Sequence, residues 1–140
     1  MKKILLLFIG FLFIQCTDDP ETYFYNVSIL NNSNKNLNIK SYHKGNLISN
    51  IDLNTSQSGL ECSYSAESFI GYKLTQCQID SIIFKFENGK GYISSINYLS
   101  DLNFSNDTNP FGFSSKFVLD NNIYQFIITS EDFENAYNLP

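Results

Sequence analysis

Apolar and polar residues alternate with a period of two over most of the chain after residue 22. Such alternation is typical of β-strands that bury one face and expose the other. Turn-forming stretches rich in Asn, Gly and Ser separate the alternating segments. The strands that this pattern predicts cover residues 23–30, 37–42, 47–53, 82–87, 92–96, 117–119 and 123–129.

Three chain reversals connect neighbouring strands as hairpins. Asn88-Gly89 stands between two alternating stretches, and this dipeptide favours a type I′ turn, in which both central residues have positive φ. Lys44-Gly45-Asn46 and Asp120-Asn121-Asn122 predict the other two reversals. The segment 60–77 is ambiguous, and the segment 97–115 is long and irregular.

A short helix is predicted near the C-terminus. Thr129 or Ser130 can cap its first turn, where Glu131 and Asp132 suit the helix dipole. Six or seven short strands followed by this helix predict one all-β domain over residues 23–140. We expect an antiparallel β-sandwich, immunoglobulin-like or similar, and a small β-barrel is the alternative.

The first residues of the chain have the pattern of an export signal. Met1-Lys2-Lys3 is basic, and an apolar run of eleven residues follows from Ile4 to Ile14. Eleven helical residues reach about 16 Å, roughly half of the hydrocarbon core of a bilayer, so the run is too short for a stable membrane span. A charged start with a short apolar run is typical of a secretory signal peptide. A buried N-terminal helix is the alternative.

The end of this run, Phe13-Ile14-Gln15-Cys16, resembles the lipobox of bacterial lipoproteins, although Gln15 replaces the small residue usual there. The resemblance implies a signal peptide over residues 1–15 and a Cys16 that is lipidated after cleavage. The acidic tether that follows, residues 16–22, is similar to the export tract of small surface-exposed outer-membrane lipoproteins of the Bacteroidota. It implies a protein on the outside of the outer membrane, and a periplasm-facing protein is the alternative.

The remaining cysteines form a candidate disulfide. If Cys16 carries the lipid, Cys62 and Cys77 are left as a pair. A disulfide between them closes a loop of about fifteen residues and stabilises the fold by about 3 kcal/mol; two free thiols are the alternative. Two cysteines and the single histidine, His43, do not make a four-ligand zinc site, so we expect no metal and no cofactor.

The charge of the chain argues against one class of partner. The 140 residues include nine Lys, no Arg and 14 acidic residues, which gives a net charge of −5. Removal of residues 1–15 takes away two of these lysines and leaves 7 Lys against 14 acids, a charge of −7. Nucleic-acid binding needs clustered cations that contact phosphates, so we expect no nucleic-acid partner.

The sequence motifs of known catalytic sites are missing. His43 is the only imidazole and lies beside a turn, and the chain has no G-x-S-x-G motif and no phosphate-binding glycine motif. The carboxylate pair Glu131 and Asp132 belongs to the predicted helix start. The residues 120–122 offer oxygens suited to calcium but lack the spacing of a calcium loop. We therefore expect a protein that is not an enzyme.

Aromatic residues make up 16% of the chain, more than one sandwich core requires. The irregular segment 97–115 carries four that we expect to face a ligand: Tyr98, Phe104, Phe111 and Phe113. Exposed rings can stack on sugars or anchor a protein partner. The alternative is that the aromatic residues fill the two faces of the sandwich.

One tripeptide is a candidate modification site. Asp80-Ser81-Ile82 resembles the Asp-Ser/Thr-aliphatic O-glycosylation pattern of exported Bacteroidota proteins. The resemblance implies a sugar on Ser81, and an unmodified Asp-Ser pair before a strand is the alternative.

The implied lipid anchor, the single β domain and the missing catalytic motifs favour a non-catalytic binding or structural role at the bacterial surface. We expect the membrane as one partner, through the anchor, and a glycan or an envelope protein as the other. The alternative is an envelope inhibitor of the immunity type that neutralises a basic protein with a concave acidic patch. The negative net charge suits that alternative.

Overall fold

Strands dominate the computed structural model, which describes residues 20–97, 102–104 and 106–140. All seven predicted strands are present, with ends within two residues of the predicted ones, whereas the strands Ser58–Ala66 and Tyr137–Asn138 were not predicted. The elements of this described part are β1 (Tyr23–Asn32), β2 (Leu37–His43), β3 (Asn46–Leu53), β4 (Ser58–Ala66), α2 (Leu74–Cys77), β5 (Ser81–Phe86), β6 (Lys90–Ser95), η1 (Asn106–Thr108), β7 (Phe117–Asp120), β8 (Ile123–Thr129), α3 (Ser130–Glu134) and β9 (Tyr137–Asn138).

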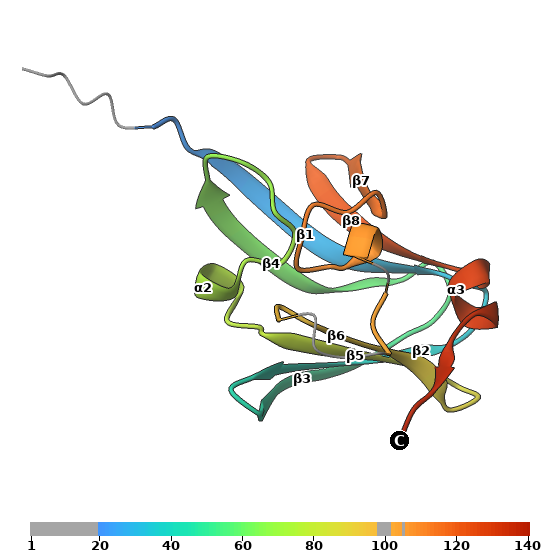
Figure 1. The fold of residues 1–140 in the computed structure, drawn as a ribbon. Helices are drawn as coiled ribbons and strands as arrows, with labels where there is room; N and C mark the ends of the chain where they lie inside the picture. The colour runs from blue at the N-terminus through green and yellow to red at the C-terminus, as the bar shows by residue number, and fades with distance from the viewer. Residues whose placement is uncertain (1–19, 98–101, 105) are drawn as a thin grey trace, which may run out of the picture.

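Two sheets pack against each other as a sandwich (Figure 1). Sheet A has the strand order β4-β1-β8-β7, and sheet B has the order β3-β2-β5-β6-β9. The sheets are mostly antiparallel and do not close into a barrel. The prediction of an all-β sandwich with a short C-terminal helix is therefore confirmed.

The alternation of side chains in β2 shows how the sequence selects the buried face. Leu37, Ile39 and Ser41 are buried between the sheets, whereas Asn38 and Lys40 are half-buried on the outer face. β5 follows the same rule, because every second residue from Ile82 to Phe86 is fully buried. The period of two in the sequence therefore separates the core from the outer face of sheet B.

One strand pair could not be read from local sequence. β1 and β8 are parallel neighbours in sheet A, with Asn26 opposite Ile123 and Asn32 opposite Thr129. Parallel strands require a long connection, and here six other described strands lie between the two in the chain. This pairing places β8 beside β1, the first strand that the structure describes.

The hairpin turns differ in type from the one predicted at Asn88-Gly89. Both central residues have positive φ at Lys44-Gly45 and at Asn121-Asn122, as a type I′ turn requires. At the predicted site only Gly89 has positive φ, and its N–H donates to the Phe86 carbonyl at 2.9 Å. The hairpin is confirmed and its type I′ turn is wrong, because three loop residues separate the strands and the glycine takes the left-handed position.

The predicted disulfide is present. Cys62 in β4 is bonded to Cys77 in α2, with a distance of 5.6 Å between their Cα atoms. The segment 60–77, whose structure the sequence left ambiguous, forms most of the strand β4 and then the one-turn helix α2. Burial and a covalent link hold this connection against sheet A.

The C-terminal helix is capped as predicted. The Thr129 hydroxyl accepts from the Asp132 N–H, and the Asp132 carboxylate accepts from the Thr129 N–H at 2.7 Å. A two-residue strand, β9, then adds to the edge of sheet B, which the sequence pattern did not predict. None of the described helices is long and apolar enough to cross a membrane.

Near this helix a mostly buried ion pair connects the segment before β7 to α3, and we call this region the Lys116 corner. The Lys116 ammonium donates to both Asp132 carboxylate oxygens, at 2.8 and 2.6 Å, and both side chains are only 13% exposed. The ammonium also lies 5.6 Å from the ring centre of Phe104. Tyr92 donates to the Asp132 carbonyl at 2.9 Å, and burial raises its pKa to about 12, with a smaller contribution from the Asp132 charge.

Candidate functional site

The outer face of sheet B carries a polar groove. Alternation in β2 and β5 directs Asn38, Lys40 and Lys85 out of the core. The antiparallel register sets Asn38 opposite Lys85 and Lys40 opposite Ile83. Lys40 and Lys85 are therefore diagonal neighbours on one face of two adjacent strands.

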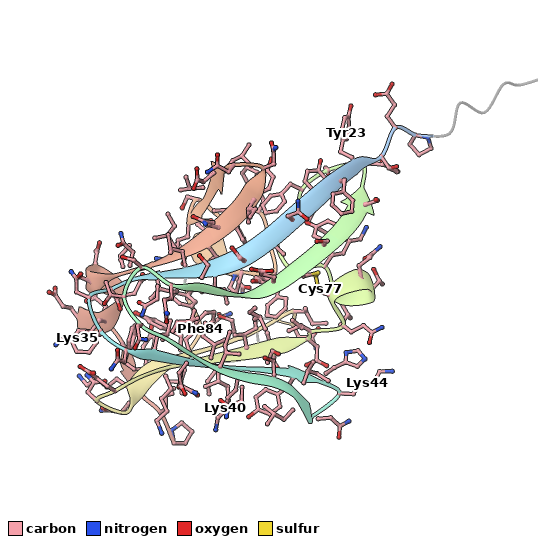
Figure 2. All side chains as sticks on the ribbon, turned by 180° about the vertical axis from the view of Figure 1, so that it is seen from behind. Tyr23, Lys35, Lys40, Lys44, Cys77 and Phe84 are labelled. Carbon is pink, nitrogen blue, oxygen red and sulfur yellow. A yellow bond between two sulfur atoms is a disulfide. The ribbon has the colours of Figure 1, made fainter. Side chains whose placement is uncertain are left out.

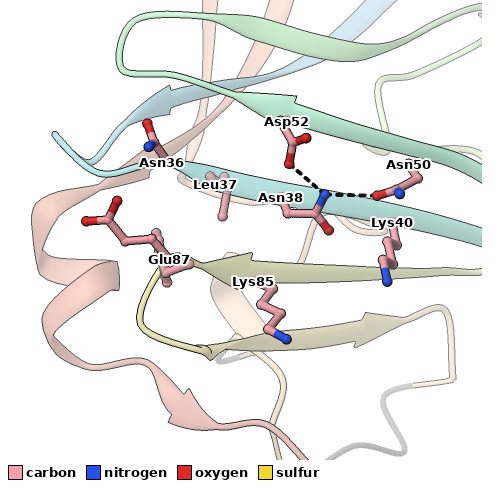
Figure 3. A pocket seen from close by; sticks show the side chains of 9 residues that line it. Asn36, Leu37, Asn38, Lys40, Asn50, Asp52, Lys85 and Glu87 are labelled. Carbon is pink, nitrogen blue, oxygen red and sulfur yellow. Dashed lines mark hydrogen bonds between the residues drawn. The ribbon is translucent and has the colours of Figure 1, made fainter.

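The first half of this groove is a depression of about 450 Å³ (Figure 3). An amide network forms its floor, because the Asn38 Nδ2 donates to Asn50 Oδ1 at 2.9 Å and to Asp52 Oδ1 at 2.8 Å. This network fixes the orientation of the Asn38 side chain between β2 and β3. The depression is lined by Asn36, Leu37, Asn38, Lys40, Asn50, Asp52, Lys85, Phe86 and Glu87.

The second half is smaller and more apolar. It encloses about 170 Å³ and shares Asn38, Lys40 and Lys85 with the first half. The two lysines therefore stand on the boundary between a polar half and an apolar half. We call the two halves together the sheet B groove. The residues that line only the second half are Tyr42, Ile83, Ile93, Leu139 and Pro140.

In the sheet B groove the carboxylates have partners within the fold, whereas the two lysines have no ion-pair partner among the described residues. Glu87 pairs with Lys35 at 3.7 Å, and Asp52 accepts from Asn38. Within residues 20–97, 102–104 and 106–140, the close contacts between basic side chains and carboxylates involve Lys35, His43 and Lys116, and neither Lys40 nor Lys85 takes part in one. The two groove ammoniums are thus the charges available to a ligand.

The aromatic residues expected to face a ligand differ in their solvent exposure. Phe104 is only 5% exposed, stacks on Tyr92 at 4.0 Å between ring centres and contacts Phe126 edge-on at 5.4 Å. The prediction for Phe104 is therefore wrong, because the sandwich core needs this ring to fill the space beside the Lys116 corner. Tyr98 lies outside the described residues.

The other two aromatic residues of that segment lie nearer the surface. Phe113 is 83% exposed, and Phe111 is half-buried against Tyr72, at 6.5 Å between ring centres. Phe113 is thus accessible as expected, although one exposed ring is not a binding platform. A ligand contact at Phe111 or Phe113 stays a prediction.

His43, Asp80 and Ser81 lie together at one end of β2 and β5. The Ser81 hydroxyl donates to Asp80 Oδ1 at 3.0 Å, and His43 Nδ1 lies 3.8 Å from Asp80 Oδ2. A serine nucleophile needs to donate to the imidazole, and here the carboxylate takes that hydrogen bond. The trio is therefore not arranged as a catalytic triad. Modification of Ser81, which is half-buried, stays a prediction.

No metal-binding arrangement is found in the part of the chain that the structure describes. Those residues include no group of three or more His, Cys, Asp or Glu side chains that could hold an ion. Asn121 and Asn122, which we considered for calcium, form the central positions of a hairpin turn. Asparagine is common in such turns because it tolerates positive φ, and this explains the two residues without a metal.

The sheet B groove lies on the layer opposite to the point where the chain enters the domain. β1 begins at Tyr23 and belongs to sheet A, whose strands form the upper layer in Figure 1. Figure 2 shows Tyr23 and Lys40 on opposite layers of the sandwich. Cys16 and residues 1–15 lie outside the described residues, so the lipid anchor stays a prediction.

Known proteins give no direct guide to the function of this chain. No protein-family model, curated protein sequence or solved structure matches it. Its function is therefore inferred from the geometry of the sheet B groove and from the N-terminal sequence pattern.

Sequence reasoning did not find the sheet B groove. The signal was present, since Lys40 and Lys85 both occupy polar positions of alternating strands. The missing information was the pairing of β2 with β5, which brings residues far apart in the sequence onto one surface. The sequence-based prediction instead placed the ligand contacts in the irregular segment 97–115.

Proposed function

We propose that the protein is a lipid-anchored, non-catalytic binding protein of the bacterial envelope, and that its ligand is a glycan bound in the sheet B groove. The observation that carries the proposal is the groove itself. It combines a hydrogen-bonded amide network and two ammonium groups with an apolar surface in its second half. Ligand sites commonly have this composition, with a few polar groups that set orientation beside apolar contact area.

The chemistry of the groove suits a sugar better than an apolar ligand. Asn36, Asn38 and Asn50 supply amide groups that both donate and accept hydrogen bonds. A saccharide presents hydroxyl groups along its edge and C–H groups on its ring face. The hydroxyl groups match the amide half, and the ring face matches the aromatic ring of Tyr42 in the other half.

Placement of the groove supports an envelope role. If Cys16 carries the lipid, the tether of residues 16–22 is short, at most roughly 25 Å when extended. The groove is on the layer remote from the start of β1 (Figure 2). A domain held by this tether can therefore present the groove to ligands away from the anchoring membrane.

The anchor is tested by intact mass spectrometry of protein extracted from membranes of a lipoprotein-competent host. We expect loss of residues 1–15 and added acyl mass on Cys16. Reduction should add about 2 Da for the disulfide between Cys62 and Cys77. A full-length species without acyl mass would remove the envelope location from the proposal. A further hexose-sized mass would indicate modification at Ser81.

Binding is tested with glycans released from bacterial envelopes and presented to the full lipidated chain in detergent. Asn38→Ala should reduce capture because it removes the amide that connects Asn50 and Asp52. The matched control is Asn26→Ala, which removes an amide from the outer face of sheet A. Equal capture by both variants and the parent chain would overturn the assignment of the groove.

A second function, the neutralisation of a basic protein, has one observation in its favour. A further groove of about 550 Å³ lies between β3 and β4, and its charged lining residues are Asp52 and Glu61. An acidic concavity of this kind can attract a basic partner. Glu61→Gln should then weaken inhibition of a lysozyme-type enzyme, and an enzyme that is not inhibited by the parent chain would count against this function.

A further inference from the structure

Two lysines stand next to each other on the sheet B groove in a protein that is acidic overall. Lys40 and Lys85 are diagonal neighbours across β2 and β5, and both line both halves of the groove. Like charges placed close together on one sheet face repel each other. Neither carboxylate of the groove forms an ion pair with these lysines, since Glu87 pairs with Lys35 and Asp52 accepts a hydrogen bond from Asn38.

We propose that Lys40 and Lys85 bind the carboxylate of an acidic saccharide, one built from uronic acid units. This inference rests on the proposed function and names the ligand class of the same groove. The two ammoniums donate to the carboxylate, whose negative charge removes their mutual repulsion. The sugar ring that carries the carboxylate lies in the adjoining apolar half, against Tyr42 and Ile83.

The other charges of the groove indicate how densely charged the ligand can be. Asp52 and Glu87 line the polar half and repel additional anionic groups there. A densely charged polymer with a phosphate on every unit would place charges against both carboxylates. An acidic saccharide with one carboxylate per ring can place that group at the lysines and its hydroxyl groups at Asn38 and Asp52.

The test uses galacturonate and glucuronate oligomers as probes and their methyl esters as uncharged counterparts. Affinity is measured by titration calorimetry with the full lipidated chain in neutral detergent. We expect the acidic oligomers to bind and the esters to bind about tenfold or more weakly, because charge-assisted hydrogen bonds are stronger than neutral ones. Higher salt should weaken the binding of the acidic oligomers and leave the esters unchanged.

Substitution separates the two lysines from the general acidity of the ligand. Lys40→Gln and Lys85→Gln should each weaken binding of the acidic oligomers by about fivefold to tenfold, and the double variant by more. Lys44→Gln is the matched control, since this exposed lysine lies in the turn between β2 and β3 and does not line the groove. Thermal unfolding of each variant verifies that the fold is kept.

The outcomes distinguish the inference from the proposed function. Equal affinity for acid and ester, with both lost in Asn38→Ala, would keep the glycan function and overturn the acidic class. Failure of the acidic oligomers to bind, with envelope glycans still captured in an Asn38-dependent way, would do the same. Capture that is independent of Asn38 would overturn the proposed function and the inference together. Equal loss in Lys44→Gln and Lys85→Gln would overturn the role of the lysine pair.

Discussion

The Lys116 corner and the sheet B groove use the same kind of residue in opposite ways. In the corner a single lysine is 13% exposed, donates twice to Asp132 and lies over the ring of Phe104. In the groove two lysines lie side by side, and no ion pair to either is found among the described residues. The corner satisfies its charge within the fold, whereas the groove lysines have no described ion-pair partner, and we propose that a ligand supplies one.

This difference follows from the surroundings of the lysines in each region. The corner connects the β7 side of sheet A to the helix cap, so a buried ammonium there needs a complete set of partners. The groove is on an outer face where water solvates free ammoniums at little cost. A charge without a protein partner in a hollowed, accessible place is therefore more informative about function than a charge in a well-formed ion pair.

The largest effect is expected from the core ring of the corner. Phe104→Ala should destabilise the fold by about 3 to 5 kcal/mol, because it empties a buried site between Tyr92 and Phe126. Phe113→Ala, which removes an 83% exposed ring, should change stability by less than about 0.5 kcal/mol. Denaturant unfolding of both variants measures the difference, and equal costs would contradict the burial of Phe104.

The next effect compares a lysine of each region. Lys116→Met should cost about 2 to 4 kcal/mol, because it leaves a mostly buried Asp132 carboxylate without its cation. Lys85→Met should be neutral within about 0.5 kcal/mol, since that lysine has an exposed side chain outside any described ion pair. The comparison between the two regions fails if both substitutions cost the same in urea unfolding.

Alkaline pH should weaken the Lys116 corner. The pKa of Tyr92 is raised to about 12 in the fold by burial, above about 10 for an unfolded tyrosine. The proton-bound form is therefore favoured by folding, so stability is complete below pH 10 and falls as pH rises from about 10 to 12. Tyr92→Phe should reduce this fall, and Tyr23→Phe should not, as followed by unfolding midpoints and absorbance at 295 nm.

The smallest effect concerns the repulsion within the groove. Lys85→Gln should raise stability by a few tenths of a kcal/mol at low salt, because it removes one of two like charges on adjacent strands. The gain should vanish at high salt, where screening removes the repulsion. A loss of stability at low salt would mean that Lys85 has a structural partner after all.

Local pattern was enough for much of the fold and for little of the site. The alternation in β2 and β5, the Thr129 cap and the pair Cys62 and Cys77 each depend on short-range or covalent chemistry that the sequence displays. The parallel contact of β1 with β8 depends on the packing of the whole chain. The sequence pattern therefore predicted the ends of most strands, but it did not predict the order of the strands within each sheet.

The same distinction explains the misplaced site. In the irregular segment no periodic pattern distinguishes a buried aromatic residue, such as Phe104, from an exposed one, such as Phe113. The groove required knowledge of which two strands are neighbours, because Lys40 and Lys85 belong to different hairpins. Pairing of distant strands is a tertiary property, and the local alternation of side chains does not indicate which strands pair.

The most direct measurement is the mapping of amide chemical shifts while galacturonate oligomers are added to the isotope-labelled lipidated chain in detergent. The shifts should concentrate at Lys40, Tyr42, Ile83 and Lys85, with the Lys116 corner unchanged. Shifts concentrated instead around Phe111 and Phe113, or on the outer face of sheet A at Asn26, would contradict the assignment of the sheet B groove as the binding site.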